Sequence, residues 1–139
     1  MQNFPKNWIP VTPSNPHVTY CFMVEENSEV LITVNQIDEK MRHHYVQFAH
    51  QMMNKELFEE KYRMIEKDTI VQTLRKNGGL GYYFMATDKN WSSNSSGWPY
   101  LLRCMYVGKH TTIELTVLCT GQQSNTIKQA FELLDNMYI

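Results

Sequence analysis

Three histidines in one helix-like segment are the first candidates for chemistry, as metal ligands. His43, His44 and His50 are separated by one, six and seven positions. Two imidazoles on one helix converge on an ion when they are three or four residues apart. At 1.5 Å per residue, His43 and His50 stand about 10 Å apart along the axis, which is too far for one ion. We therefore predict no metal site, and solvated or partly covered histidines on a helix face.

The three cysteines are candidates for a nucleophile or a disulfide. A catalytic thiol needs a neighbouring histidine, and His17 and His110 stay open as partners. Cys21, Cys104 and Cys119 all fall in predicted strands, however, where thiols usually pack as inert side chains. Their odd number, without CxxC spacing, allows at most one disulfide. We expect three buried structural thiols.

The glycine-rich run Gly78-Gly79-Leu80-Gly81 is the remaining chemical candidate, as a phosphate-binding loop. Such loops rely on the free N-terminus of a following helix, whereas a strand-like pattern follows here, so we interpret the run as a turn. The chain also lacks the nucleophile-elbow, Walker, zinc-protease and EF-hand signatures. We predict a non-enzymatic protein with no catalytic residue and no cofactor.

Composition predicts one packed domain over residues 1–139. Hydrophobic residues make up 42% of the chain and aromatic residues 12%, which is too apolar for a disordered segment. Thirteen Lys and Arg against fourteen Asp and Glu leave a charge of −1, so no net field attracts nucleic acid or an anionic membrane. No stretch approaches the roughly 20 apolar residues of a membrane span. We expect a soluble protein with no nucleic-acid partner.

The first residues show no basic region followed by an apolar one, as a signal peptide would. We expect a cytoplasmic protein as written, or a periplasmic one if a signal peptide has been removed.

The first third of the chain predicts a hairpin and then a helix. Prolines within residues 1–16 predict an extended lead-in. Alternating segments at His17–Val24 and Glu29–Ile37, around the turn-like residues 25–28, predict an antiparallel hairpin. Asp38 is a suitable N-cap for a helix that fades near Asn54, with one more turn over residues 56–60. Its apolar stripe is expected to face the core: Met41, Tyr45, Phe48 and Met52.

The middle of the chain predicts further strands. Short strands are expected at Tyr62–Glu66 and Thr69–Leu74, and a longer one at Leu80–Ala86 after the Asn77-Gly-Gly turn.

Tyr100–Val107 and Thr111–Cys119 form the clearest predicted hairpin. A two-residue turn at Gly108-Lys109 would set Leu102 against Leu115 and Arg103 against Glu114. We expect Arg103 in an exposed ion pair and the opposite face in the core, with Leu102, Cys104, Ile113, Leu115 and Val117.

A final helix follows Gly121, capped by Ser124 or Thr126. Its apolar stripe is expected to pack on the sheet: Ile127, Ala130, Phe131, Leu134 and Met137. The predicted fold class is α+β, an antiparallel sheet of about six or more strands with a long helix after the first hairpin and a C-terminal helix.

The polar loop at residues 87–99 contains two tryptophans. A large aromatic in a polar loop either folds back as an anchor or fills a pocket of a partner. We hypothesise a partner-binding surface here, made by Asp88, Asn90, Trp91, Asn94 and Trp98.

A cleft between the sheet and the first helix is the rival site. It could bind a small molecule, with Tyr45, Tyr82 and Tyr83 lining a pocket. The many methionines would also suit a groove for an apolar helix.

The layout of the chain resembles the PsbP-like superfamily. The resemblance rests on Phe4-Pro5-Lys6-Asn7-Trp8, similar to the family's P-x-x-W motif, and on the strand Asn77-Gly-Gly-Leu-Gly-Tyr-Tyr-Phe84. The order of hairpin, helix, long hairpin and closing helix also matches over nearly the whole chain. The family includes the extrinsic protein of photosystem II, the eukaryotic Ran-binding nucleotide-release factor and small bacterial proteins.

The resemblance implies a non-enzymatic binding protein, because known members are mostly binders. Bacterial members include chaperones that hold apolar helices of type VI secretion effectors. Our leading hypothesis is a bacterial protein-binding accessory factor, an immunity-like toxin antagonist, with an effector chaperone as the alternative. The partner would be a toxin or a secreted effector, and the sequence also allows a homodimer.

Overall fold

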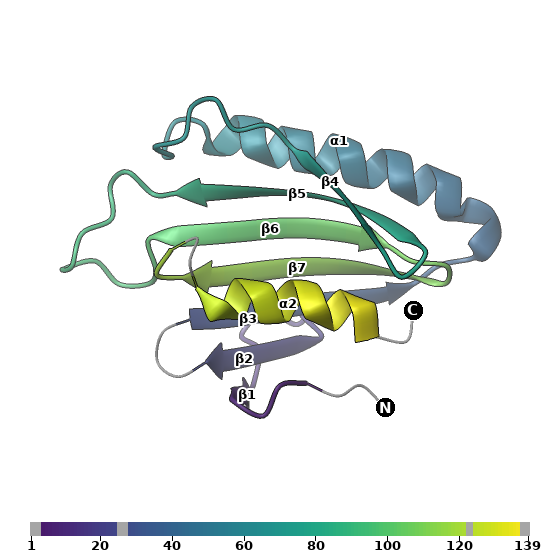
Figure 1. The fold of residues 1–139 in the computed structure, drawn as a ribbon, viewed down its shortest axis with the longest axis horizontal. Coiled ribbons are helices and arrows are strands. Elements are labelled where there is room, and N and C mark those ends of the chain that lie inside the picture. Colours follow the sequence, from purple (N-terminus) through teal and green to yellow (C-terminus); the bar gives the residue numbers. More distant parts are fainter. Residues whose placement is uncertain (1–3, 25–27, 122–123, 137–139) are drawn as a thin grey trace.

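The computed structural model describes residues 4–24, 28–121 and 124–136, which form an antiparallel sheet with helices on both faces. Within these residues the sheet has seven strands in the order β1-β2-β3-β7-β6-β5-β4 (Figure 1). The strands are β1 (Trp8–Val11), β2 (Tyr20–Val24), β3 (Ser28–Gln36), β4 (Gln72–Lys76), β5 (Gly79–Thr87), β6 (Tyr100–Val107) and β7 (Thr111–Cys119). The helices are α1 (Arg42–Glu60), which follows the short 3₁₀ turn η1 (Glu39–Met41), and α2 (Asn125–Asn136). The predicted α+β class is confirmed.

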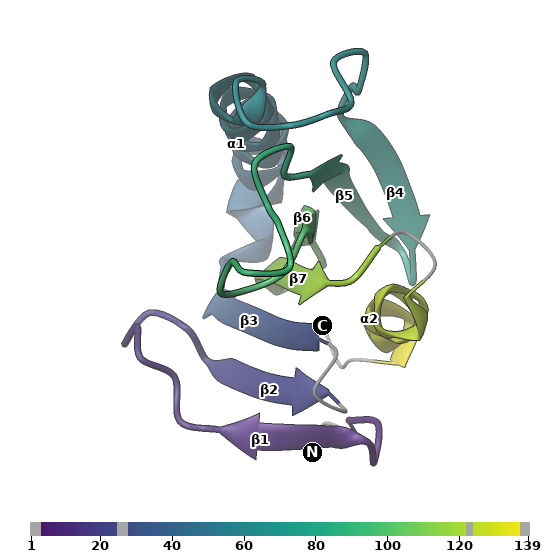
Figure 2. The same ribbon diagram turned by 90° about the vertical axis from the view of Figure 1, so that its left-hand side faces the viewer.

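The two helices cover opposite faces of the sheet (Figure 2). Successive residues of a strand point to opposite faces, and β6 shows this directly. Its residues Leu102 and Cys104 belong to the core under α2, whereas Met105 and Val107 belong to the core under α1. The sheet is therefore buried on both sides over β6, which lies between β7 and β5.

The pairing of β3 with β7 joins the two ends of the chain in one sheet, because Val30 lies opposite Val117 and Val34 opposite Ile113. The indole nitrogen of Trp8 in β1 also donates a 3.0 Å hydrogen bond to Gln129 of α2. Residues more than 80 positions apart are thus in contact.

The C-terminal hairpin has the predicted strand bounds but a different register. Leu102 lies opposite Val117 and Cys104 opposite Leu115. The amide of Gly108 bonds to the carbonyl of Thr111 (2.8 Å), so the turn is Lys109-His110, one residue later than predicted. That shifts the pairing by two residues, which preserves the faces. The predicted core residues are buried, as expected: Leu102, Cys104, Ile113, Leu115 and Val117.

The buried stripe of α1 coincides only in part with the predicted one, of which Tyr45 and Met52 pack partly buried against the core under α1. Ala49, Met53 and Leu57 are buried, whereas Met41 is exposed and Phe48 is 50% exposed. The helix carries two apolar stripes that are offset by one residue, and periodicity alone does not show which of the two is buried. The side chain of Asp38 accepts a bond from the Lys40 amide (3.0 Å), so Asp38 caps η1, whereas the N-cap position of α1 is Met41, which makes no side-chain cap bond. The helix continues to Glu60.

Two elements in the first half of the chain differ between the prediction and the structure. The extended lead-in contains β1, an edge strand in which Pro10 is tolerated because only one side of the strand is paired. Residues 62–66 do not form a strand, since Met64 makes only an isolated bridge to Asp88. The next strand begins at Gln72 rather than Thr69.

Helix α2 confirms the predicted C-terminal element. Ser124 Oγ accepts a bond from the Thr126 amide (3.3 Å), so Ser124 is the cap. Ile127, Ala130 and Leu134 are buried, and Phe131 packs partly buried against the same core. Met137 and residues 25–27 of the predicted first turn lie outside the described residues. No described helix combines the length and apolarity that a membrane span requires.

Candidate partner-binding surface

The loop at residues 88–99 is closed and shaped by its own hydrogen bonds. The Asp88 amide bonds to the Pro99 carbonyl (2.8 Å) at the base of the loop. The Asp88 carboxylate accepts from the Asn90 amide (2.9 Å). The indole nitrogen of Trp91 donates to the Gly97 carbonyl (3.2 Å). Trp91 therefore folds back within its own loop.

The loop is also bonded to the segment that follows α1. The Ile65 amide donates to Thr87 (2.9 Å), and the Lys89 amide donates to Arg63 (2.8 Å). The Glu66 carboxylate accepts from the Thr87 amide (2.8 Å) and hydroxyl (2.6 Å). Burial alone would raise the pKa of Glu66, but these hydrogen bonds lower it below its ordinary value. The two segments are thus held together by both backbone and side-chain bonds.

Large apolar side chains lie exposed on this segment and on the last turn of α1. Four of them are between 60% and 76% exposed, although the intervening Met64 is buried: Phe58, Tyr62, Ile65 and Ile70. The segment and the loop lie at the same end of the molecule, at the left in Figure 1. We call these four side chains together with loop 88–99 the end surface.

Two hollows open at the end surface. One of about 160 Å³ lies between the segment and the loop, against Arg63, Met64 and Trp98. Another of about 370 Å³ is lined by Ile70 and Tyr100, among others. Burial, with a contribution from the Glu66 charge, raises the pKa of Tyr100 to about 12. Its phenol therefore stays neutral under physiological conditions.

Most of the hypothesised binding residues are exposed. Asp88, Asn90 and Asn94 are exposed, and Trp91 and Trp98 are half-buried. Sequence reasoning did not bring the four apolar residues of the end surface together, because residues 56–60 were assigned to a helical turn and residues 62–66 and 69–74 to short strands. A usable signal was present, since the apolar residues there fit neither a helical stripe nor a strict alternation.

The three tyrosines of the predicted cleft are divided between the two faces of the sheet. Tyr45 and Tyr82 pack in the core under α1. Tyr83, the next residue along β5, packs under α2, with its ring 5.2 Å from that of Phe131. Neighbouring residues of a strand point to opposite faces, so no single cleft holds all three.

The thiols are poor nucleophiles. Cys104 and Cys119 are buried, Cys21 is partly buried, and all three are free. Burial raises the pKa of Cys104 to about 12, against a lowering effect of Arg103. Burial and the Glu29 charge raise that of Cys21. Across the described ranges, no group of three or more His, Cys, Asp or Glu side chains could hold a metal ion.

One half of the sheet face beside α1 has no helix over it among the described residues, as Figure 2 shows for β1 to β3. Ile9 and Val11 are exposed there. Pairing places Met23, Cys21 and Leu31 on the same face. We call this the open sheet face.

One flank of α1 borders the open sheet face. The stripe that includes Phe48 and Met52 continues at the same spacing to Glu56. Glu56 binds Arg103, which also reaches Thr116 of β7. Phe48 and Glu56 therefore lie on the flank of α1 nearest to β7, whereas Tyr45 and Met52 of the predicted stripe pack partly buried against the core under α1.

The comparisons with known proteins concern the fold. No family model and no curated protein matches the chain. A solved structure does match, the cyanobacterial PsbP (CyanoP) from Synechocystis. The two are 13% identical, with a TM-score of 0.55 over 94% of this chain and 80% of that one. At this identity the likeness concerns architecture alone, and the protein has the PsbP-like fold.

Proposed function

We propose that this protein is a non-enzymatic accessory factor that binds a protein partner through the end surface. The observation that carries the proposal is the exposure of four large apolar side chains on the last turn of α1 and on the segment that is bonded to loop 88–99. Isolated apolar residues are ordinary on protein surfaces, but a group of them beside polar residues is typical of an interaction site. Asp88, Asn90 and Asn94 supply the polar part.

Among protein binders, the role we propose is an immunity-like antagonist of a bacterial toxin. The bonds of Asp88 and Trp91 already shape the loop, so little conformational freedom is lost there on binding. A preorganised surface with aromatic anchors favours a tight complex that dissociates slowly. Stoichiometric blocking of a toxin requires such a complex and needs no catalytic group.

Two isoleucines of similar exposure provide a matched test. Ile65 lies on the end surface and is 60% exposed, whereas Ile9 lies on β1 and is 57% exposed. The protein serves as bait in a lysate of its source organism, and the captured partner is then produced alone in cells to measure its toxicity. We expect Ile65→Asp to weaken capture about tenfold or more and to abolish neutralisation of the toxin. Ile9→Asp should leave both intact.

Two outcomes would contradict this proposal. If both variants lost capture equally, the end surface would be excluded as the binding site. A stoichiometric partner that is harmless when produced alone would exclude the antagonist role while leaving protein binding in place.

A second candidate, a chaperone for a secreted effector, is favoured by the open sheet face. The apolar part of this face, which Glu29 and Thr33 border, has no helix over it among the described residues and can receive an apolar helix from a partner as the missing layer. The exposed Phe48 on the neighbouring flank of α1 would add to that contact. The partner would then be held at a different place from the end surface.

Two phenylalanines on the same helix distinguish the candidates. Phe48 borders the open sheet face, and Phe58 belongs to the end surface. If the protein is a chaperone, Phe48→Ala should weaken capture of the partner and Phe58→Ala should not. The antagonist proposal predicts the reverse, measured with the same partner by calorimetry.

A further inference from the structure

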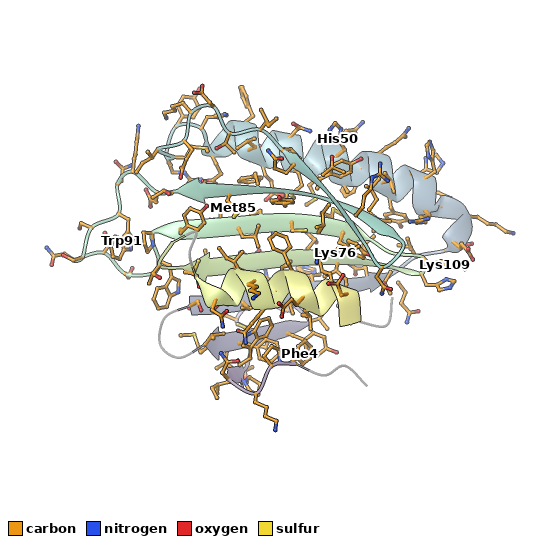
Figure 3. All side chains as sticks on the ribbon, in the orientation of Figure 1. Phe4, His50, Lys76, Met85, Trp91 and Lys109 are labelled. Atoms are coloured by element: carbon orange, nitrogen blue, oxygen red, sulfur yellow. The ribbon has the colours of Figure 1, made fainter. Side chains whose placement is uncertain are left out.

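A third hollow, of about 500 Å³, lies between the first turn of α1 and the β4–β5 turn. Its lining includes Lys40, Arg42, His43, Arg75 and Gly78. These elements meet at the end of the molecule away from the end surface, and Figure 3 shows Lys109 at that end and Trp91 at the other. We call this hollow the cationic pocket.

The charge of the cationic pocket is poorly compensated. Lys40, Arg42 and Arg75 bring three positive charges, and Glu39 is the one carboxylate in the lining. Glu39 is itself 3.9 Å from the ammonium of Lys109. Among the described residues, no ion pair involves any of the three cations. The pocket therefore carries a net positive field.

Arg42 is fixed in the pocket by the β4–β5 turn. Asn77 and Gly78 both have positive φ, at 50° and 77°, which sets the shape of the turn. The Gly78 carbonyl accepts a 2.9 Å bond from Arg42 Nη2. Arg42 Nε is buried and has no hydrogen-bond partner in the described part of the chain. A buried donor without an acceptor is costly, and no carboxylate of the described residues lies within ion-pair distance of this guanidinium.

We infer that the cationic pocket binds the phosphate group of a small soluble molecule. A guanidinium held in place and two further cations match an oxyanion that carries more than one negative charge. A volume of about 500 Å³ is in the range of small-molecule sites. The inference is independent of the proposed protein binding, because the pocket lies at the other end of the molecule.

Titration of the full chain with phosphate, followed by amide NMR shifts, tests the inference. Inorganic phosphate and glycerol phosphate are the probes, and sodium chloride at matched ionic strength is the control. We expect saturable shifts in the amides of Arg42, Arg75 and Gly78 with phosphate and none with chloride. Tighter binding of the ester would identify an organic phosphate, and equal binding would identify free phosphate as sufficient.

Exposed cations supply the matched variants, since their loss leaves the fold intact. Arg75→Gln and Lys40→Gln remove charges of the pocket, and Lys55→Gln removes an exposed charge on α1 outside its lining. We expect about tenfold weaker phosphate binding in the first two variants and no change in the third. Shifts that never saturate, that chloride reproduces, or that Lys55→Gln weakens equally would overturn the inference.

Discussion

At the residue scale, Arg103 shows how a tertiary contact changes the structural role of a charged side chain. Its guanidinium binds both carboxylate oxygens of Glu56, at 2.9 and 3.0 Å. It also donates to Thr116 (2.6 Å) and to Glu114 (3.4 Å). The sequence predicted an exposed pair with Glu114 alone, because Glu56 arrives from a helix 47 positions away. The side chain is only 17% exposed and joins α1 to the sheet.

Removing Arg103 should therefore be costly. We expect Arg103→Ala to lower the free energy of unfolding by about 2 to 4 kcal/mol, because two carboxylates lose their partner at a partly buried site. Arg63→Ala is the control, since that side chain is 63% exposed in its pair with Glu60, and it should cost less than about 1 kcal/mol. Urea denaturation of both variants measures the difference. Equal losses would mean that Arg103 behaves as a surface charge.

Glu66 makes a pH-dependent contribution to stability. Its pKa is lowered in the folded protein, so its stabilising effect is present above the ordinary glutamate value of 4.5 and is lost as the pH falls through the lower folded value. Glu66→Gln should therefore destabilise the protein at neutral pH and have a smaller effect in acid. Thermal melts of both proteins at pH 7 and about pH 3.5 test this sign. A larger effect of the variant in acid would contradict it.

At the scale of elements, α1 shows why periodicity finds a helix more readily than it finds the buried face. Both Met41 and Met53 belong to apolar stripes of helical spacing. Met53 is buried against the sheet beside Ala49, whose small side chain lets the helix approach closely, whereas Met41 is exposed. Which stripe faces inward is decided by the sheet, and the helix sequence does not contain that information.

Met53 of α1 and Met41, the last residue of η1, test which of the two apolar stripes is buried. We expect Met53→Ala to cost about 2 to 5 kcal/mol of unfolding free energy through the cavity it leaves. Met41→Ala should change the unfolding free energy by less than about 0.5 kcal/mol. Guanidinium denaturation of the two variants gives both numbers, and the opposite ranking would restore the predicted core stripe.

The loop at residues 88–99 is held in shape by hydrogen bonds within the loop. Trp91→Ala removes the indole bond to Gly97 and should loosen residues 88–99. Because the ring packs within an exposed loop, we expect a global stability loss of less than about 1 kcal/mol. Hydrogen exchange should show faster exchange in this loop only. A loss of about 3 kcal/mol or more would instead make Trp91 an anchor of the main core.

At the scale of the whole molecule, the sequence predicted the class of fold better than its details. The strand bounds of the long hairpin follow from alternation in residues 100–119, and the capped C-terminal helix follows from Ser124 and the stripe after it. The turn at Lys109-His110 was misplaced because Gly108, the residue best suited to a turn, pairs with Thr111 instead. Strand β1 was missed because of Pro10. Within a strand, proline is found mainly when the strand is at an edge of the sheet, and the sequence did not show that residues 8–11 form an edge.

Only part of the candidate site was predicted, because the rest depends on contacts between distant segments. The loop with Trp91 stands out by composition alone. The exposed Tyr62, Ile65 and Ile70 do not, because the same residues would suit a buried strand. Their exposure results from the path of the chain between α1 and β4, which depends on bonds from the segment to Thr87 and Lys89. Such bonds join separate segments and leave no local pattern.

The pairing of β3 with β7 also governs how the chain can fold during synthesis. Residues 28–36 pair with residues 111–119, so the first hairpin leaves the ribosome long before its neighbour in the sheet exists. Until then the edge of β3 has no partner and is open to pairing with other chains. Closing so long a loop is slow. Refolding measured by stopped-flow fluorescence should therefore take milliseconds to seconds, as all-β proteins do, rather than the microseconds to milliseconds of helical bundles.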